Sequence, residues 1–283
     1  MRIGISSWAY SFPGGAGDID RWCREAIAAG CDHLEIGGEL VGAVTDEDAA
    51  RFRECLDGYG LTRSVCGLFS AERDLASTSR DAREAGLEYA RACVEFSARI
   101  GARVLVGAFG GAGGDGSGSR SERIGRLAEA LTVIAGYAVP LGVVCGIEAL
   151  NRYENDLITT VADSVAVVDA VDSPQLGVHL DLFHAGIEEE DVAQAIRAAG
   201  RRLVHLHAVS HRRRAPGEGT AQDWAAITEA LVQAGYRGNA VMEIFRPGSA
   251  IARLARISDS QYDFDASIRN GVRFLRGVAA ALA

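Results

Sequence analysis

The chain has 283 residues, enough for one large α/β barrel or for two small domains. Hydrophobic residues make up 48% of it and charged residues 24%, which is typical of a soluble globular protein. The net charge of -9 argues against a surface for nucleic acids or anionic membranes, because phosphate binding depends on Lys and Arg. The first residues turn polar too early for a signal peptide, and no run approaches the ~20 apolar residues of a membrane helix.

Short β-rich segments alternate with helix-like segments along the whole chain. We expect strands near residues 2–7, 31–36, 62–67, 103–107, 143–148, 176–181, 203–208 and 239–244. We expect helices near residues 18–29, 46–58, 80–100, 120–138, 161–170, 189–199, 222–234 and 262–280. Such alternation implies parallel strands with right-handed crossovers. The sequence therefore predicts a (β/α)8 TIM barrel forming a single domain over residues 1–283, with an open doubly wound sheet as the alternative.

A glycine-rich stretch at 107–118 follows the fourth expected strand, and we interpret it as a loop on the active face. Residues 111–116 match G-x-G-x-x-G by letter. A dinucleotide site needs this motif in a tight turn that opens a helix, whereas here the next helix starts later. We therefore expect no nucleotide cofactor, and we interpret the stretch as a lid over the active site.

Four of the expected strands end in a residue that can bind a metal: Glu148, Asp181, His207 and Glu243. The carboxyl ends of the strands of a parallel barrel meet on one face, where catalysis takes place. Three carboxylates that converge there repel one another, and a divalent cation relieves the repulsion. Oxygen-rich ligation with a single imidazole favours Mn²⁺, with Co²⁺ or Mg²⁺ as alternatives.

Three further polar residues share the inward face of these strands. His179 lies two residues before Asp181, and His205 lies two residues before His207. We interpret both as hydrogen-bonded interior residues, either of which could orient a metal ligand. Glu35 on the second expected strand could reach the metal or fill a buried polar role, and the sequence leaves both alternatives open.

The motifs around these strand ends resemble those of the D-tagatose 3-epimerase and D-psicose (allulose) 3-epimerase family, within the xylose-isomerase-like sugar isomerases. The resemblance is strongest over residues 143–250, and it rests on the segments 146–154, 178–184, 186–190, 205–219 and 241–245. It implies that Glu148, Asp181, His207 and Glu243 bind the metal and that Glu148 and Glu243 also form the acid/base pair. It further implies that Glu154, His184 and Arg213 hold the C1–C2 end of the substrate.

The chain departs from this family's pattern in three places. The loop after the fourth strand has Gly and Ala where the family has large aromatic residues. The first strand has Ser6, Ser7, Trp8 and Tyr10 in place of several tyrosines, and Ser210 stands where the family has Glu. These changes leave the expected chemistry in place, but they leave the identity of the sugar open.

The function expected from this resemblance is a metal-dependent ketose 3-epimerase that interconverts C3 epimers of free keto-sugars through a cis-enediolate. An aldose–ketose or hydroxypyruvate-type isomerase and a keto-inositol dehydratase are alternatives on the same metal site. A non-catalytic sugar-binding protein is the alternative outside enzymes. Six scattered cysteines without a C-x-x-C pair indicate a reducing cytoplasm, and relatives suggest a homodimer or homotetramer.

Overall fold

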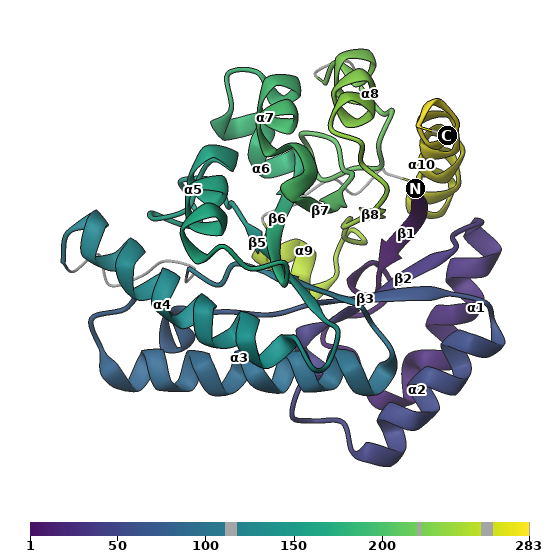
Figure 1. Ribbon diagram of the computed structural model, residues 1–283. Coiled ribbons are helices and arrows are strands. Elements are labelled where there is room, and N and C mark those ends of the chain that lie inside the picture. Colours follow the sequence, from purple (N-terminus) through teal and green to yellow (C-terminus); the bar gives the residue numbers. More distant parts are fainter. Residues whose placement is uncertain (111–117, 220–221, 256–262, 283) are drawn as a thin grey trace.

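The computed structural model describes residues 1–110, 118–219, 222–255 and 263–282. Its eight parallel strands close into a barrel in which each strand pairs with its neighbours in the sequence and β1 pairs with β8. Figure 1 shows the strands at the centre with helices around them. The predicted TIM barrel is confirmed. The strands are β1 (Arg2–Ser6), β2 (His33–Gly37), β3 (Thr62–Cys66), β4 (Val104–Gly107), β5 (Val144–Glu148), β6 (Leu176–Asp181), β7 (Leu203–His207) and β8 (Asn239–Met242).

Helices cover the outside of the barrel and follow the predicted alternation. The longer ones are α1 (Ile19–Ala29), α2 (Asp46–Gly58), α3 (Arg80–Ile100), α4 (Arg120–Ala138), α5 (Val161–Val171), α7 (Val192–Ala199), α8 (Trp224–Gln233) and α10 (Phe264–Ala281). The last helix, α10, lies beside β1, so the two ends of the described chain are close together (Figure 1). It also contacts α1, α8 and β8, which places it on the outside of the barrel.

Two short helices are additions to the predicted pattern. The helix predicted near 189–199 is α7, which begins at Val192, whereas α6 (Leu182–Glu188), which starts directly after β6, was not predicted. The side chain of Asp181 caps α6 by accepting a hydrogen bond of 2.6 Å from the backbone N–H of Phe183. The second addition, α9 (Ala250–Leu254), follows β8. Both short helices lie at the carboxyl ends of strands, where they shape the site.

Glycine ends helices where the sequence predicts it. Gly30 follows α1 with φ of +89°, and Gly101 follows α3 with φ of +78°. Their backbone N–H groups bond to carbonyls of the last helical turn. Only glycine takes this left-handed conformation without steric cost, which lets the chain turn directly into the next strand.

Within the described part of the chain, no helix combines the length and the apolar character needed to cross a membrane. The glycine-rich stretch interpreted as a lid lies mostly outside the described residues. Its first part belongs to β4, and the buried Phe109 that follows packs against Phe69 with ring centroids 4.6 Å apart.

The conformation of Gly101 makes a testable demand on stability. Gly101→Ala should lower the free energy of unfolding by about 1–2 kcal/mol, because a Cβ is strained at positive φ. Gly136→Ala is the matched control: Gly136 is exposed inside α4 with open space around it, so the change should stabilise the protein by about 0.5–1 kcal/mol. Urea unfolding of both variants measures the two effects, and equal effects at the two sites would contradict the argument.

Candidate active site

The four predicted metal ligands meet at the carboxyl ends of adjacent strands. Glu148, Asp181 and His207 are the last residues of β5, β6 and β7, and Glu243 directly follows β8. Atoms of Glu148, Asp181 and His207 lie within 4.8 Å of one another. The Nδ1 atom of His207 is 3.6 Å from Asp181 Oδ2 and 3.7 Å from Glu243 Oε2. All four side chains are buried, so the structure brings together the residues that the sequence singled out.

Strand register explains this convergence. Asp181 of β6 pairs with His207 of β7, so their side chains leave the sheet at the same level and on the same, inward side. Glu148 of β5 pairs with His179, which places Glu148 two residues below Asp181 in the register. The carboxylates form a buried cluster around the imidazole of His207, and His184 Nε2 also lies 3.8 Å from Asp181 Oδ2.

The donor set fits a divalent cation. The Nδ1 atom of His207 is buried and has no hydrogen-bond partner, although it faces carboxylate oxygens. Burial raises the pKa of Glu148 well above its usual value, and it raises the pKa of Glu243 against the opposing charge of Arg213. Burial would lower the pKa of His207, but the charges of Glu35 and Glu243 raise it well above its usual value. Protons on Glu148 and His207 thus reduce the repulsion among the carboxylates, as a bound metal would.

Arg213 reaches into this cluster from the turn after β7. Its guanidinium donates a hydrogen bond of 2.9 Å to Asp181 Oδ2 and pairs with Glu243. Although burial raises it, the pKa of Asp181 is held below its usual range chiefly by the charge of Arg213. The guanidinium also lies 4.4 Å from the ring centroid of Phe183 and 5.4 Å from that of Phe245, so two aromatic rings fix its plane.

The backbone around Arg213 is unusual. Its φ is +54°, a backbone conformation that residues with a Cβ adopt only at a cost in free energy. Ser210 accounts for the turn: its carbonyl accepts from the N–H of Arg213 at 2.9 Å, and its N–H donates to the carbonyl of Arg214 at 2.8 Å. Ser210, one of the positions at which this chain departs from the epimerase pattern, closes this turn through its backbone, and its hydroxyl accepts from the N–H of Arg214 at 3.2 Å.

His184 and Glu154 are joined by a residue that the sequence analysis missed. His184, on α6, has its Nε2 atom 2.9 Å from the guanidinium of Arg213. The side-chain amide of Asn151 lies 2.7 Å from His184 Nδ1 and donates to Glu154 Oε1 at 2.9 Å. Burial lowers the pKa of His184 to about 4, so its ring is neutral. Asn151 lies inside the motif that carries the family resemblance, and its position three residues before Glu154 was the available signal.

A cavity of about 480 Å³ opens above these residues. Glu148, Glu243, Glu154, His184 and Arg213 form its polar end. Its remaining wall is mostly apolar and comes from the loops after several strands. That wall consists of Trp8, Phe12, Cys66, Gly67, Leu68, Phe69, Ala108, Leu150, Tyr153, Phe183, Phe245, Ile251, Leu254 and Ala255. One polar end and one apolar wall are typical of a small-molecule site.

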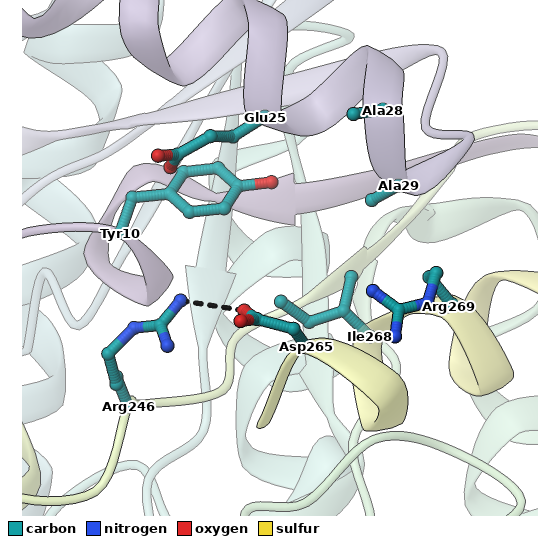
Figure 2. A pocket seen from close by; sticks show the side chains of 8 residues that line it. All are labelled: Tyr10, Glu25, Ala28, Ala29, Arg246, Asp265, Ile268 and Arg269. Atoms are coloured by element: carbon teal, nitrogen blue, oxygen red, sulfur yellow. Dashed lines mark hydrogen bonds and ion pairs between the residues drawn. The ribbon is translucent and has the colours of Figure 1, made fainter. Parts of the chain in front are cut away.

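Trp8 and Tyr10, the aromatic residues singled out after the first strand, face different cavities. Trp8 lines the main cavity, and its indole N–H donates to Glu39 Oε2 at 2.7 Å. Tyr10 instead points into a second cavity of about 250 Å³, where it faces Glu25 of α1 and Asp265 of α10 (Figure 2). Arg246 and Asp265 form an ion pair of 2.8 Å in this second cavity. Of the two aromatic residues, Trp8 alone contributes to the main cavity.

The deeper histidines are buried, as predicted, but neither makes the predicted hydrogen bond among the described residues. His205 Nε2 lies 2.9 Å from Glu35 Oε2, an ion-pair contact without hydrogen-bond geometry. For His179 the prediction of a hydrogen bond was wrong, because neither ring nitrogen has a partner among the described residues. Its Nδ1 is 3.7 Å from Glu148 Oε2, too far for a hydrogen bond.

Glu35 is buried at the level of His207, and its Oε1 atom lies 2.8 Å from His207 Nε2. Burial would raise the pKa of Glu35, but the charge of His207, its hydrogen bond and the nearby His205 hold it well below the usual value. Glu35 is therefore ionised. The sequence leaves two roles open for Glu35, and Glu35 was not among the predicted site residues.

The chain matches the family model described as xylose isomerase-like TIM barrel over residues 23–277. It is 32% identical to the D-psicose 3-epimerase of Ruminiclostridium cellulolyticum over 87% of this chain and 84% of that protein. It is 33% identical to the L-ribulose 3-epimerase of Methylomonas sp. over 78% of each. A crystal structure of a D-psicose 3-epimerase in the presence of D-fructose superimposes with a TM-score of 0.90 at 27% identity, covering 98% and 99% of the two chains.

These comparisons confirm two predictions. The resemblance to ketose 3-epimerases that the strand-end motifs indicate extends over most of the chain. The expected enzyme class, an isomerase of the epimerase type that acts on carbohydrates, is the class of these relatives. The roles of individual residues and the identity of the metal stay predictions.

Metal binding should release protons. The raised pKa values of His207 and Glu148 mean that both groups carry a proton in the free protein, and a ligand must lose it. We expect the affinity for Mn²⁺ to rise with pH through the range above 6.5. Calorimetric titration in two buffers of different ionisation enthalpy measures the number of protons released.

The control for this titration is His211→Ala, which alters an exposed histidine in the loop after β7 and should leave the number of protons released unchanged. His207→Ala should abolish tight binding. Mn²⁺ binding that is independent of pH, or that survives His207→Ala, would contradict the site.

Proposed function

Because this chain belongs to the xylose isomerase-like TIM barrel family, we propose that it is a metal-dependent ketose 3-epimerase that acts on free keto-sugars. One observation carries the proposal. Two buried carboxyl groups from separate strands, Glu148 and Glu243, line one cavity beside Asp181 and His207. This arrangement offers the two proton-transfer groups that inversion at a carbon next to a carbonyl requires.

We propose Glu148, Asp181, His207 and Glu243 as the ligands of a divalent metal, with Mn²⁺ favoured over Co²⁺ and Mg²⁺. The support is the oxygen-rich donor set with one unpaired imidazole nitrogen. A bound divalent cation would act as a Lewis acid that polarises the oxygens of the ketose.

Glu148 and Glu243 act as the acid/base pair. One of them, as a carboxylate, removes the proton from C3, and the electron pair moves toward the carbonyl to give a cis-enediolate. The other, as a carboxylic acid, returns a proton to C3 from the opposite face. Burial supports both roles, because it raises the two pKa values toward the range in which a carboxyl group exchanges protons near neutral pH.

Three residues hold the reacting end of the sugar. Arg213 offers charged N–H donors, and neutral His184 beside it offers a further polar contact to the developing oxyanion. Glu154 lies at the same end of the cavity, where it binds a hydroxyl group. The side chain of Asn151 contacts both Glu154 and His184 and fixes their relative positions, so these residues act as one unit.

The cavity supports an unphosphorylated substrate. Arg213 is the sole Arg or Lys among the described residues that line it, and Asp181 and Glu243 already pair with its guanidinium. A phosphate at the distal end would face Trp8, Phe12 and Ile251, which offer little to pair with its charge. The relatives named for D-psicose and L-ribulose support free ketoses of five or six carbons as the substrates.

The deciding experiment is a turnover screen in D₂O, read by NMR. Metal-free protein receives Mn²⁺ and is offered D-fructose, D-psicose, D-tagatose, L-ribulose and their aldose partners. We expect deuterium at C3 together with the C3 epimer. Aldose formation with exchange at C1 or C2 would instead establish the isomerase alternative, and metal binding without any exchange would refute the substrate class. The homo-oligomeric state and the cytoplasmic location stay predictions.

The acid/base pair makes a prediction about partial reactions. Glu148→Gln and Glu243→Gln should each lower kcat for epimerisation about 10²–10⁴-fold, because one proton transfer loses its catalyst. Each variant keeps one base, so each should still exchange the C3 proton of one epimer with D₂O, and the two variants should act on opposite epimers. Rapid mixing followed by NMR of both epimers measures this.

Metal content has to be determined for both variants, because both residues are proposed ligands. Glu190→Gln, which alters an exposed carboxylate, is the matched control and should keep full turnover. If both variants exchange the same epimer, the two-base mechanism is wrong.

A further inference from the structure

We propose that Glu35 is a positioning residue for the metal centre: it holds the proton of His207 on Nε2 and thereby directs Nδ1 to the metal. This inference rests on the proposed metal site, and it adds a residue from β2, on the side of the barrel opposite the ligand strands. It starts from the position of Glu35, whose side chain is fully buried and reaches a histidine 172 residues away in the sequence.

The imidazole of His207 lies between the carboxylate of Glu35 on one side and those of Asp181 and Glu243 on the other. Its Nε2 atom is 2.8 Å from Glu35 Oε1, within hydrogen-bond distance. Its Nδ1 atom faces Asp181 and Glu243 at 3.6 and 3.7 Å and has no hydrogen bond. A neutral imidazole carries one N–H, and a carboxylate can only accept it. Once His207 has lost its second proton, as a metal ligand must, the remaining proton therefore resides on Nε2, and the lone pair of Nδ1 is directed at the proposed ligand cluster.

Glu35 is itself held in place from two other strands. Its Oε2 atom accepts a hydrogen bond of 2.9 Å from Ser64 Oγ on β3, and it lies 2.9 Å from His205 Nε2 on β7. Ser64 in turn lies 2.9 Å from His33 Nε2. Both oxygens of Glu35 are thus engaged inside the barrel, which fixes the carboxylate and, through it, the plane of the His207 ring.

A carboxylate on the far nitrogen of a ligating histidine has two physical effects. It selects the tautomer and the orientation of the ring, and its charge makes the ligating nitrogen more basic. Loss of such a partner commonly weakens metal affinity 10–100-fold. The rival interpretation makes Glu35 itself a ligand, because Glu35, Cys66 and His207 also present atoms within 4.8 Å of one another. In that case His207 would bind through Nε2, and Cys66 would bind as a thiolate.

The first experiment reads the tautomer directly and requires no turnover. Protein labelled with ¹⁵N at its six histidines is compared by two-bond ¹H–¹⁵N NMR without metal and with Zn²⁺, a diamagnetic probe. The His207 signals are identified by their loss in His207→Gln. We expect a proton on Nε2 and the metal on Nδ1.

Zn²⁺ on Nε2 of His207 would overturn the proposal while leaving the metal site in place. If no histidine signal responds to Zn²⁺, the metal site itself is wrong, and the proposed function and this inference fall together. In the Co²⁺-loaded protein, a thiolate charge-transfer band in the near ultraviolet would favour the rival ligand set with Cys66.

The second experiment measures affinity in variants. Glu35→Ala should raise the dissociation constant for Mn²⁺ 10–100-fold, and Glu35→Gln, which keeps an oxygen that can accept from Nε2, should raise it less. At saturating Mn²⁺ both variants should regain most of kcat, because Glu35 does not line the substrate cavity. An unchanged dissociation constant in a folded variant, or a loss of kcat that saturating metal does not restore, would overturn the proposal.

Glu39→Gln is the matched control, since it removes a carboxylate four residues further along that contacts Trp8 and Gly14 rather than the ligand cluster. It should leave the metal affinity unchanged. Near-ultraviolet circular dichroism of the metal-free variants separates a local effect from a loss of packing. Should Glu35→Ala fail to fold, Glu35→Gln and the NMR measurement on the unaltered protein still decide the question.

Discussion

Negative charge buried at one end of the barrel is the constraint on which the site depends. Glu148, Asp181 and Glu243 are each less than a tenth exposed and crowd around one imidazole. A buried carboxylate without a partner is costly, so this arrangement persists only with compensating charge. Protons and Arg213 provide that compensation in the free protein, and a divalent cation would provide it in the working enzyme. The proposed affinity for metal thus follows from the same burial that supports the proposed proton transfer by the carboxyl groups.

The compensating groups are themselves held by structure around them. Arg213 is held between Phe183 and Phe245, on a turn with positive φ that Ser210 closes. His207 is held from behind by Glu35. The barrel is suited to this task because eight strands bring side chains from distant parts of the sequence to one level, where they can contact across the interior.

The cavity above the charged cluster separates chemistry from recognition. Its polar end consists of Glu148 and Glu243 at strand ends and of polar residues from the segments that follow the strands. Its apolar wall comes largely from loops and from the short helix α9. Trp8 turns its only polar atom away from the cavity to Glu39, so it presents a hydrocarbon surface there. Loop residues of this kind can change the shape of the cavity without altering its charged end.

The sequence by itself determined the strand–helix order, the barrel and the four strand-end residues, because these depend on local periodicity and on which polar residue ends an apolar run. It did not reveal α6, because a short helix directly after a strand has too few residues to show a helical period. It also could not assign Glu35 or Asn151, whose roles depend on contacts across the barrel or between loops. Tertiary structure alone decided that Glu35 lies behind His207, that Trp8 and Tyr10 face different cavities, and that Arg213 enters the carboxylate cluster. The physical reason is that these relations depend on how strands pair and loops fold back in space, whereas sequence periodicity reports only which face of its own element a residue occupies.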